Sequence, residues 1–148
     1  MNDDAALAAG TGDAKLLDVT FTARAENLKE IRRAVRDAVK RAGCQDRIAD
    51  DIVIAIDEAC QNVIRHGYGG DSDEPIELAM QVNGGELIAR IRDNAPTVDA
   101  AAITPRDLDD LRPGGLGTHF MREIMDSVDY AAGSSERGNL LTMRKKIG

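Results

Sequence analysis

The sequence predicts an α+β fold, a two-layer sandwich in which helices lie on one face of a mostly antiparallel sheet. An alternating strand opens the domain, and two segments with helical periodicity follow it. A hairpin comes next, then a long aperiodic segment, a third helix and a second hairpin. Hairpins join antiparallel strands, and this order of elements favours helices that pack together on one side of the sheet.

Length and composition are those of one ordinary domain. The chain has 148 residues, 43% of them hydrophobic, and a domain of this size buries about 70% of its unfolded surface. Two cysteines are too few for a disulfide framework or a metal site, which favours a reducing cytoplasm. A formal net charge of -7 argues against general affinity for nucleic acid, because phosphate backbones are bound by clusters of lysine and arginine.

The beginning of the chain predicts neither a membrane span nor a signal peptide. No run of about 18 apolar residues is present. Residues 1–14 are rich in Asp, Ala and Gly and precede Lys15, the first basic residue. We therefore expect a disordered tail over 1–14 and one cytoplasmic domain over 15–148.

The first strand and the first helix are predicted by their apolar spacing. The strand has apolar residues at alternate positions, Leu17, Val19 and Phe21. The helix has them at helical spacing and ends near Gly43, because glycine commonly stops helices. The apolar positions of this helix are Leu28, Ile31, Val35, Ala38, Val39 and Ala42.

A second helix is predicted from about Asp46 to His66, and glycines at 67, 69 and 70 end it. Its apolar side consists of Ile48, Ile52, Ala55, Ile56, Ala59, Val63 and Ile64. Its polar side is one continuous stripe of residues three and four apart, Glu58, Gln61, Asn62, Arg65 and His66.

The second half of the chain contains two predicted hairpins and a long segment between them. The first hairpin turns at Asn83-Gly84-Gly85 between alternating residues 76–82 and 86–92. Residues 93–117 have no periodicity, and so long a segment in a compact domain is usually functional. A helix then follows Gly114, and the last two strands alternate at Val128 and Tyr130 and at Leu141 and Met143.

Glu58 and Asn62 lie one turn apart on the second helix. A carboxylate at Glu58 can accept a proton from an attacking hydroxyl, and the amide oxygen of Asn62 is a hard ligand suited to magnesium. Asp57 and Gln61 have the same spacing, so the sequence does not choose between the two pairs. A solvated helix face is the alternative interpretation.

Asp93 and a glycine-rich turn are two further candidates. The Asp93 carboxylate lies at the end of a strand and could accept a hydrogen bond from the exocyclic amine of adenine, although an Asp in this position often caps a turn. Residues 114–117, Gly-Gly-Leu-Gly, open a helix and offer free amide groups to phosphate, or they form a plain structural turn. They are not a P-loop, because no Gly-Lys-Ser/Thr follows.

In order and spacing, these three places together resemble the ATP site of the GHKL superfamily of gyrase, heat-shock and histidine-kinase ATPases. The resemblance is greatest to the anti-sigma-factor serine kinase branch and covers roughly residues 17–147. The N-box of that branch is similar to Asp57-Glu58-Ala59-Cys60-Gln61-Asn62-Val63-Ile64-Arg65-His66-Gly67-Tyr68. Its second glycine box is similar to Gly115-Leu116-Gly117 through Met125-Asp126-Ser127-Val128-Asp129-Tyr130.

The resemblance implies a role for each matching residue. Glu58 is the implied general base, Asn62 the magnesium ligand and Asp93 the adenine contact, with Thr142 expected to join Asp93 near adenine. The loop between Asp93 and Gly114 is the implied ATP lid, with Arg106 or Arg112 reaching the terminal phosphate. The residues implied at the nucleotide are Asn62, Arg65, His66, Asp93, Ala95, Arg112, Gly115, Leu116, Gly117, Thr118 and Thr142.

Ala95 departs from the superfamily pattern, which usually has glycine two residues after the adenine aspartate. The methyl group could crowd the base if the backbone requires a glycine conformation, and it is harmless at an ordinary one. His66 and His119 are interpreted as capping or packing residues rather than phosphoacceptors.

The predicted function is that of a serine/threonine kinase that uses ATP and Mg²⁺. By resemblance, it phosphorylates a small anti-sigma-factor antagonist and acts as an anti-sigma factor, with sigma-factor binding and a homodimer left open. Neither nucleic acid nor a membrane is an expected partner. Two alternatives remain, a non-catalytic ATP-binding module that switches a partner, and a detached ATPase domain of a two-component system.

Overall fold

Within the part of the chain that the structure describes, five strands form one sheet in the order β1-β2-β3-β5-β4, and every neighbouring pair is antiparallel. The computed structural model describes residues 13–97, 121–132 and 137–148. The strands are β1 (Asp13–Thr22), β2 (Pro75–Asn83), β3 (Glu86–Pro96), β4 (Ser127–Ala132) and β5 (Arg137–Lys146).

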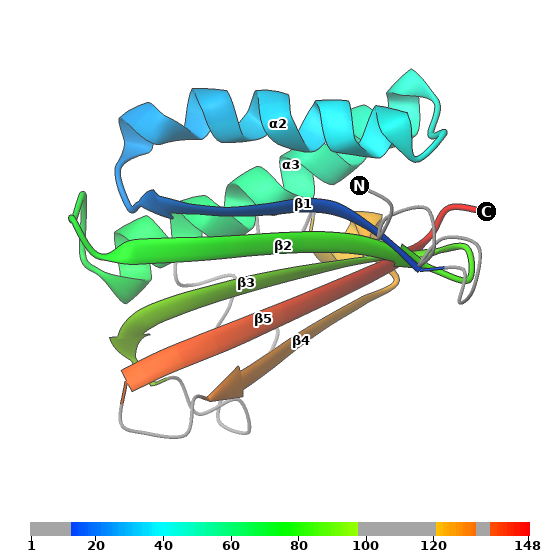
Figure 1. The fold of residues 1–148 in the computed structure, drawn as a ribbon. Coiled ribbons are helices and arrows are strands. Elements are labelled where there is room, and N and C mark those ends of the chain that lie inside the picture. The colour runs from blue at the N-terminus through cyan, green and yellow to red at the C-terminus, as the bar shows by residue number, and fades with distance from the viewer. Residues whose placement is uncertain (1–12, 98–120, 133–136) are drawn as a thin grey trace.

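Two long helices cover one face of this sheet (Figure 1). A short 3-10 turn, η1 (Ala25–Asn27), leads into α2 (Leu28–Arg41), and α3 (Asp46–Asn62) continues into a π-helical turn, η2 (Val63–Gly67). Residues 121–124 are also helical. The α+β fold expected from the sequence is therefore confirmed.

The core lies between the helices and the alternate residues of each strand that face them. In the central hairpin, Leu78 lies opposite Ile91 and Met80 opposite Ala89. The largest fully buried side chains of the described residues are Ile52, Ile56, Ile76, Leu78, Met80, Leu87, Ile91, Met121, Met143, Val35 and Val39.

Most predicted elements are found where the periodicity places them. The turn at Gly84 and Gly85 has φ values of 60° and 83°, which glycine adopts without strain and which suit a tight hairpin. Gly43, with φ of 95°, follows α2 as expected. β1 begins at Asp13, two residues before the expected start of the domain.

Two element boundaries differ from the prediction. The second helix ends as an α-helix at Asn62, and its last turn is π-helical because the Tyr68 amide bonds the Val63 carbonyl at 2.8 Å. β3 extends to Pro96, three residues beyond Asp93, which was expected at the end of the strand. The extension follows from pairing with β5, where Pro96 lies opposite Arg137, and no local pattern reports it.

A row of ion pairs joins the two helices on their polar sides. Three basic residues of α2, spaced four apart, meet three aspartates of α3. The pairs are Arg32 with Asp57, Arg36 with Asp50 and Lys40 with Asp46.

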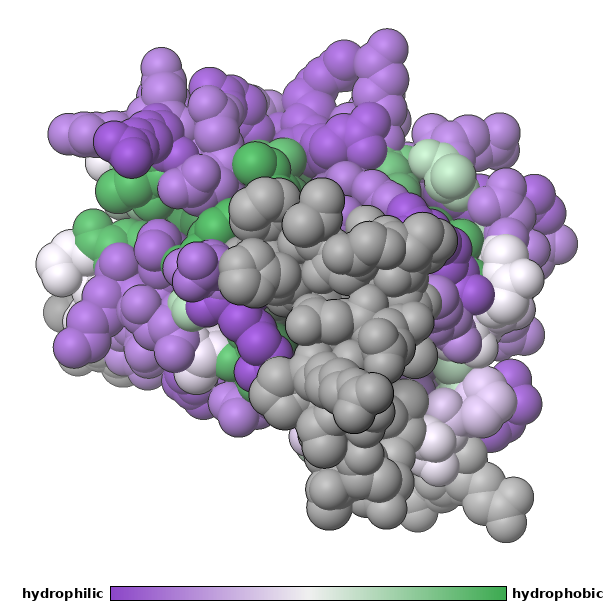
Figure 2. All heavy atoms as spheres, turned by 180° about the vertical axis from the view of Figure 1, so that it is seen from behind, coloured by the Kyte–Doolittle hydropathy of each residue, from purple (hydrophilic) through white to green (hydrophobic). Residues whose placement is uncertain are grey.

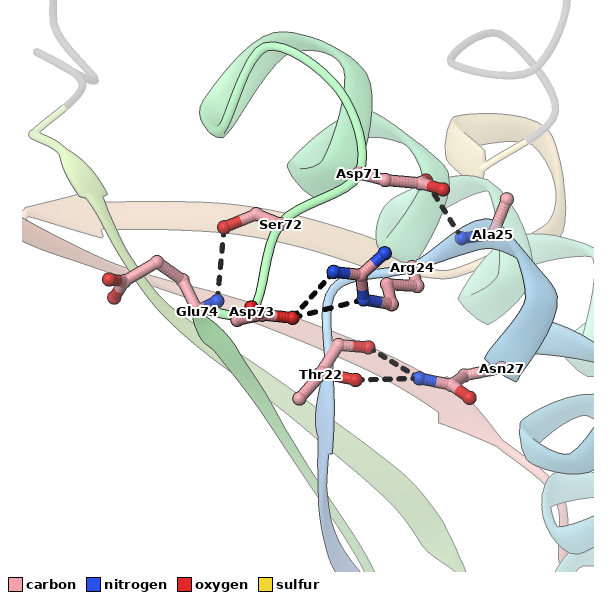
Figure 3. A network of polar contacts seen from close by, with 8 residues as sticks. All are labelled: Thr22, Arg24, Ala25, Asn27, Asp71, Ser72, Asp73 and Glu74. Atoms are coloured by element: carbon pink, nitrogen blue, oxygen red, sulfur yellow. Dashed lines mark hydrogen bonds and ion pairs between the residues drawn. The ribbon is translucent and has the colours of Figure 1, made fainter.

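The loop after β1 and the loop before β2 are joined by a network of polar contacts (Figure 3). Arg24 donates from Nε and Nη2 to one carboxylate oxygen of Asp73, at 3.0 and 2.6 Å. The Ala25 amide donates to Asp71 at 3.0 Å, at the beginning of η1. These contacts fix how the chain enters α2 relative to the end of η2.

Figure 2 shows the molecule from behind the view of Figure 1. On this side, hydrophilic side chains cover much of the described surface, with small hydrophobic areas between them. Within the described ranges, none of the helices has the length and apolar character needed to span a bilayer. Both cysteines, Cys44 and Cys60, are buried and free.

Candidate active site

Asn62 is the last residue of α3, and its amide oxygen is the most informative atom of the candidate site. This Oδ1 is buried and has no hydrogen-bond partner among the described residues. A buried acceptor without a partner costs about 1–3 kcal/mol, so such atoms in native proteins call for an explanation. A ligand that takes up this oxygen would supply one.

Asp57 and Gln61, the pair that the sequence could not distinguish from Glu58 and Asn62, are engaged elsewhere. Arg32 of α2 donates to Asp57 Oδ1 at 3.0 Å, and Gln61 donates to Asp57 Oδ2 at 2.7 Å. Arg65 in turn donates to Gln61. Asp57 therefore has partners on α2 and on its own helix.

Glu58 lies one residue further along, which turns its side chain by about 100° around the helix axis from that of Asp57. It is half-buried, and Asn62 follows it by four residues. The two pairs on α3 therefore differ, because Asp57 binds α2 and Gln61 binds Asp57, whereas Glu58 and Asn62 lie on a neighbouring line of the helix surface.

The π-helical turn η2 begins directly after Asn62. Such turns are rare and occur frequently at functional sites, because the added residue changes the direction of the following side chains. Here the turn brings Gly67 against β3, where a Cβ on Gly67 would lie 3.2 Å from the Cβ of Ala95. The end of the Asn62 helix therefore contacts the strand that carries Asp93.

Asp93 is 8% exposed and faces the helix side of the sheet, opposite Ile76 of β2. The Ala95 amide donates to its Oδ1 at 2.9 Å, the local hydrogen bond that the turn-capping alternative expects. Asn139 of β5 donates from Nδ2 to the same oxygen at 3.0 Å. Both bonds use Oδ1, and both donors fix the orientation of the carboxylate.

Asn139 is a site residue that the sequence reasoning missed, and it replaces Thr142 as the neighbour of Asp93. Asn139 lies directly opposite Asp93, whereas Thr142 lies opposite Arg90 and points to the other face of the sheet. The structure therefore places Asn139, and not Thr142, beside Asp93, while contact of Thr142 with the nucleotide stays a prediction. The alternation of Leu141 and Met143, extended by one step, would have identified Asn139 as the residue on the same face.

Ala95 is fully buried, and no residue other than glycine has a positive φ in the described ranges. The backbone here does not require glycine, so alanine introduces no backbone strain at this departure from the superfamily pattern.

The other predicted residues are placed as follows. Arg65 and His66 are exposed on η2, and Arg65 is joined to Gln61. Arg106, Arg112, Gly115, Leu116, Gly117, Thr118 and His119 lie outside the described residues, as do the implied lid and glycine box.

A hollow of about 390 Å³ lies elsewhere, between the beginning of α2 and the end of α3. Its lining includes Leu28, Arg32 and Arg65, whereas Glu58, Asn62 and Asp93 do not line it. We therefore place the candidate site by chemistry, at the end of α3 and β3, rather than in this hollow.

A family model, the histidine kinase-like ATPase domain, matches residues 21–145 of the chain. The chain belongs to this family. The matched region contains the polar stripe of α3 and both strands of the Asp93–Asn139 contact.

Among curated proteins, this ATPase domain is similar to the serine-protein kinase RsbW of Bacillus pumilus. The two are 29% identical over 129 residues, which cover 80% of each chain. The RsbW of Bacillus subtilis is 27% identical over 124 residues, 78% of each chain. An anti-sigma F factor of Clostridium botulinum is 27% identical over 137 residues, 88% of this chain and 94% of that protein.

Two solved structures have the same fold as this ATPase domain. The SiaB–SiaC complex of Pseudomonas aeruginosa contains a chain with a TM-score of 0.64 and 18% identity, matched over 88% of this chain and 89% of its own. The RsbU and RsbW domains of a Mycobacterium tuberculosis protein give a TM-score of 0.63 and 21% identity, over 88% of this chain and 31% of that one.

Within the described ranges, no group of three or more His, Cys, Asp or Glu side chains could hold a metal ion. Magnesium does not require such a group, because it commonly keeps several waters and takes few protein ligands beside the phosphates of a substrate. The buried Asn62 oxygen fits one such ligand.

Proposed function

We propose that this chain is an ATP-dependent serine/threonine protein kinase that acts as an anti-sigma factor and phosphorylates a small antagonist protein. The observation that carries the proposal is the difference between the two pairs of polar residues on α3. Asp57 is bound by Arg32, while Asn62, one turn from Glu58, keeps a buried oxygen without a partner among the described residues. The serine-protein kinases and the anti-sigma F factor to which the chain is similar support the choice of reaction and partner.

ATP is the proposed phosphate donor, and Asp93 is the proposed contact to its base. An ionised carboxylate only accepts hydrogen bonds, so it favours the exocyclic amine of adenine over the carbonyl of guanine. Ala95 and Asn139 hold the Asp93 carboxylate in one orientation before any ligand binds. This preorganisation lowers the cost of binding.

Asn62 is the proposed protein ligand of Mg²⁺, and the bound ion would neutralise charge on the phosphates during transfer. Gly115, Leu116, Gly117 and Thr118 stay predicted phosphate contacts, with Arg112 or Arg106 at the terminal phosphate. Arg65 and His66 stay predicted at the nucleotide as well.

Glu58 is the proposed general base. Its carboxylate would accept the proton of the serine or threonine hydroxyl as the new bond to phosphorus forms. Its place on a regular helix, one turn from Asn62, fixes it relative to the proposed metal ligand. Catalysis by this chain would thus consist mostly of positioning.

The experiment that tests the proposal uses ATP labelled in its terminal phosphate, Mg²⁺ and each candidate antagonist encoded near the gene. We expect one of these proteins to become labelled on a single serine or threonine, mapped by mass spectrometry. ATP binding without transfer to any candidate would favour the non-catalytic module. Transfer to histidine would favour the two-component alternative.

A further inference from the structure

Tyr68 directly follows η2, and its hydroxyl lies between two strands of the sheet. It donates to the carbonyl of Pro75 on β2 at 2.7 Å and accepts from the amide of Asn94 on β3 at 2.7 Å. The regular pairing of β2 with β3 ends one step earlier, at Ile76 and Asp93. The phenol oxygen therefore bridges the two backbone groups that would come next in the ladder.

This bridge fixes the place where β3 leaves its neighbours. On the β5 side, the register shifts between Asp93 and Pro96, so the strand is irregular there as well. Asp93 thus lies at the last regular position of β3, with the Tyr68 bridge on the β2 side and Asn139 on the β5 side. A loss of the bridge would remove the hydrogen bond of the Asn94 amide, which directly follows Asp93 in the chain.

The hydroxyl can serve as a donor at neutral pH. Burial raises the pKa of Tyr68 above its ordinary value of 10.0, and the negative charge of Asp93 adds to this rise. The phenol therefore stays protonated and keeps its bond to the Pro75 carbonyl. Phenylalanine would keep the ring and its packing against the core but would lose both hydrogen bonds.

The chain joins the two halves of the candidate site through this one segment. Asn62 ends α3, five residues before Gly67 contacts Ala95, and Tyr68 comes next. The same short stretch that begins at the proposed magnesium ligand therefore reaches the strand of the proposed adenine contact.

We propose that Tyr68 is a positioning residue for base recognition, whose hydroxyl holds the Asn94 backbone so that the Asp93 carboxylate faces the amino group of adenine. This inference rests on the proposed function, since it takes Asp93 as the adenine contact. Tyr68 acts through Asp93 and need not touch the nucleotide.

The test is calorimetry of Tyr68→Phe with ATP and with inosine triphosphate, which lacks the exocyclic amine. We expect ATP affinity to fall about 5- to 30-fold and inosine triphosphate affinity to change less than about twofold. Asp93→Asn should likewise reduce the ratio of ATP affinity to inosine triphosphate affinity. Thr22→Val, which removes a hydroxyl bonded to Asn27 at the same end of the sheet, should leave it unchanged.

The outcomes separate this inference from the proposed function. A wild-type ratio in Tyr68→Phe, or an equal loss for both nucleotides, overturns the role of Tyr68 alone. Wild-type protein that binds both nucleotides equally, or neither, overturns the adenine contact and the inference with it.

If circular dichroism shows that Tyr68→Phe does not fold, a second pair of variants tests the same coupling. Gly67→Ala places a Cβ 3.2 Å from the Cβ of Ala95, which must displace the strand slightly. It should lower the ATP preference, and adding Ala95→Gly should restore it. An unchanged preference in Gly67→Ala would contradict the proposed coupling.

Discussion

The amide oxygen of Asn62 is buried without a partner among the described residues, and this gives a prediction with two opposite parts. Asn62→Ala removes an unsatisfied acceptor, so the melting temperature of the ligand-free protein should not fall by more than about 2 °C. The same variant should lose the additional rise in melting temperature that Mg²⁺ gives in the presence of ATP. Thermal unfolding with and without each ligand measures both.

Gln61→Ala is the matched control, because Gln61 lies next to Asn62 in the chain but bonds Asp57 and Arg65. It should keep the magnesium-dependent rise. A magnesium-dependent rise that survives in Asn62→Ala would show that another group holds the ion.

Cys60 gives a prediction on alkaline stability. Burial, with the Asp57 charge as a smaller cause, raises the pKa of this thiol from 9.0 to about 12. Between these two pKa values the Cys60 thiol is ionised in the unfolded chain and protonated in the folded chain. Unfolding therefore releases a proton in this range, and the free energy of unfolding falls as pH rises. Below pH 9 the group contributes no pH dependence.

Between about pH 9 and pH 10.5, the free energy of unfolding of Cys60→Ala should therefore fall less steeply than that of the wild type. The difference in slope should correspond to the release of at most one proton. Urea unfolding at several pH values measures the slope. Tyr68 and Tyr130, whose pKa values are also raised by burial, retain part of the dependence. Equal slopes in the variant and the wild type would exclude Cys60 as a contributor.

Some residues of the candidate site could be predicted from the local sequence pattern, and others could not. Glu58 and Asn62 could be predicted as candidates because their spacing on a helix is visible in the chain. The choice against Asp57 could not, because it depends on Arg32 of another helix. Asn139 was missed in favour of Thr142, since only the register of β3 with β5 decides which side chain meets Asp93.

Among the elements, the row of ion pairs between α2 and α3 gives a stability prediction. Arg32→Gln removes the pair with Asp57, whose side chain is 16% exposed, and should lower the free energy of unfolding by about 0.5–1 kcal/mol. The loss should shrink in 1 M salt, where charges are screened within about 3 Å. Urea unfolding at low and high salt measures it.

Arg33→Gln is the control, because Arg33 pairs only loosely with Glu30 of its own helix, at 3.7 Å, and both side chains are largely exposed. It should change stability less than Arg32→Gln. If the two variants are equally stable, the pair between the helices contributes nothing measurable.

The elements themselves were largely predictable, for physical reasons. The hairpin was visible because its turn needs two positive φ values and the sequence offers Gly84 and Gly85. The last residues of β3 were not, because they pair with the distant strand β5, where Pro96 lies opposite Arg137. The π turn η2, which the hydrogen bond from the Tyr68 amide to the Val63 carbonyl defines, was not predicted either, and it ends where Gly67 approaches Ala95.

In the whole molecule, the fold brings three separate stretches to one end of the sheet. Glu58 and Asn62 come from α3, Asp93 from β3 and Asn139 from β5, and the η2 turn joins the first stretch to the second. The family match over residues 21–145 includes all of them. Since folds of this kind occur in proteins with different partners, the activity depends on the chemistry at this end rather than on the architecture.

The proposed kinase reaction depends on Glu58 accepting the hydroxyl proton, and single-turnover phosphate transfer from ATP to the antagonist protein measures this step. Glu58→Gln keeps the size of the side chain but cannot take up the proton. It should leave ATP affinity within about threefold and lower the transfer rate by about a hundredfold or more, while Asp57→Asn changes neither. Transfer at the wild-type rate by Glu58→Gln would contradict the account.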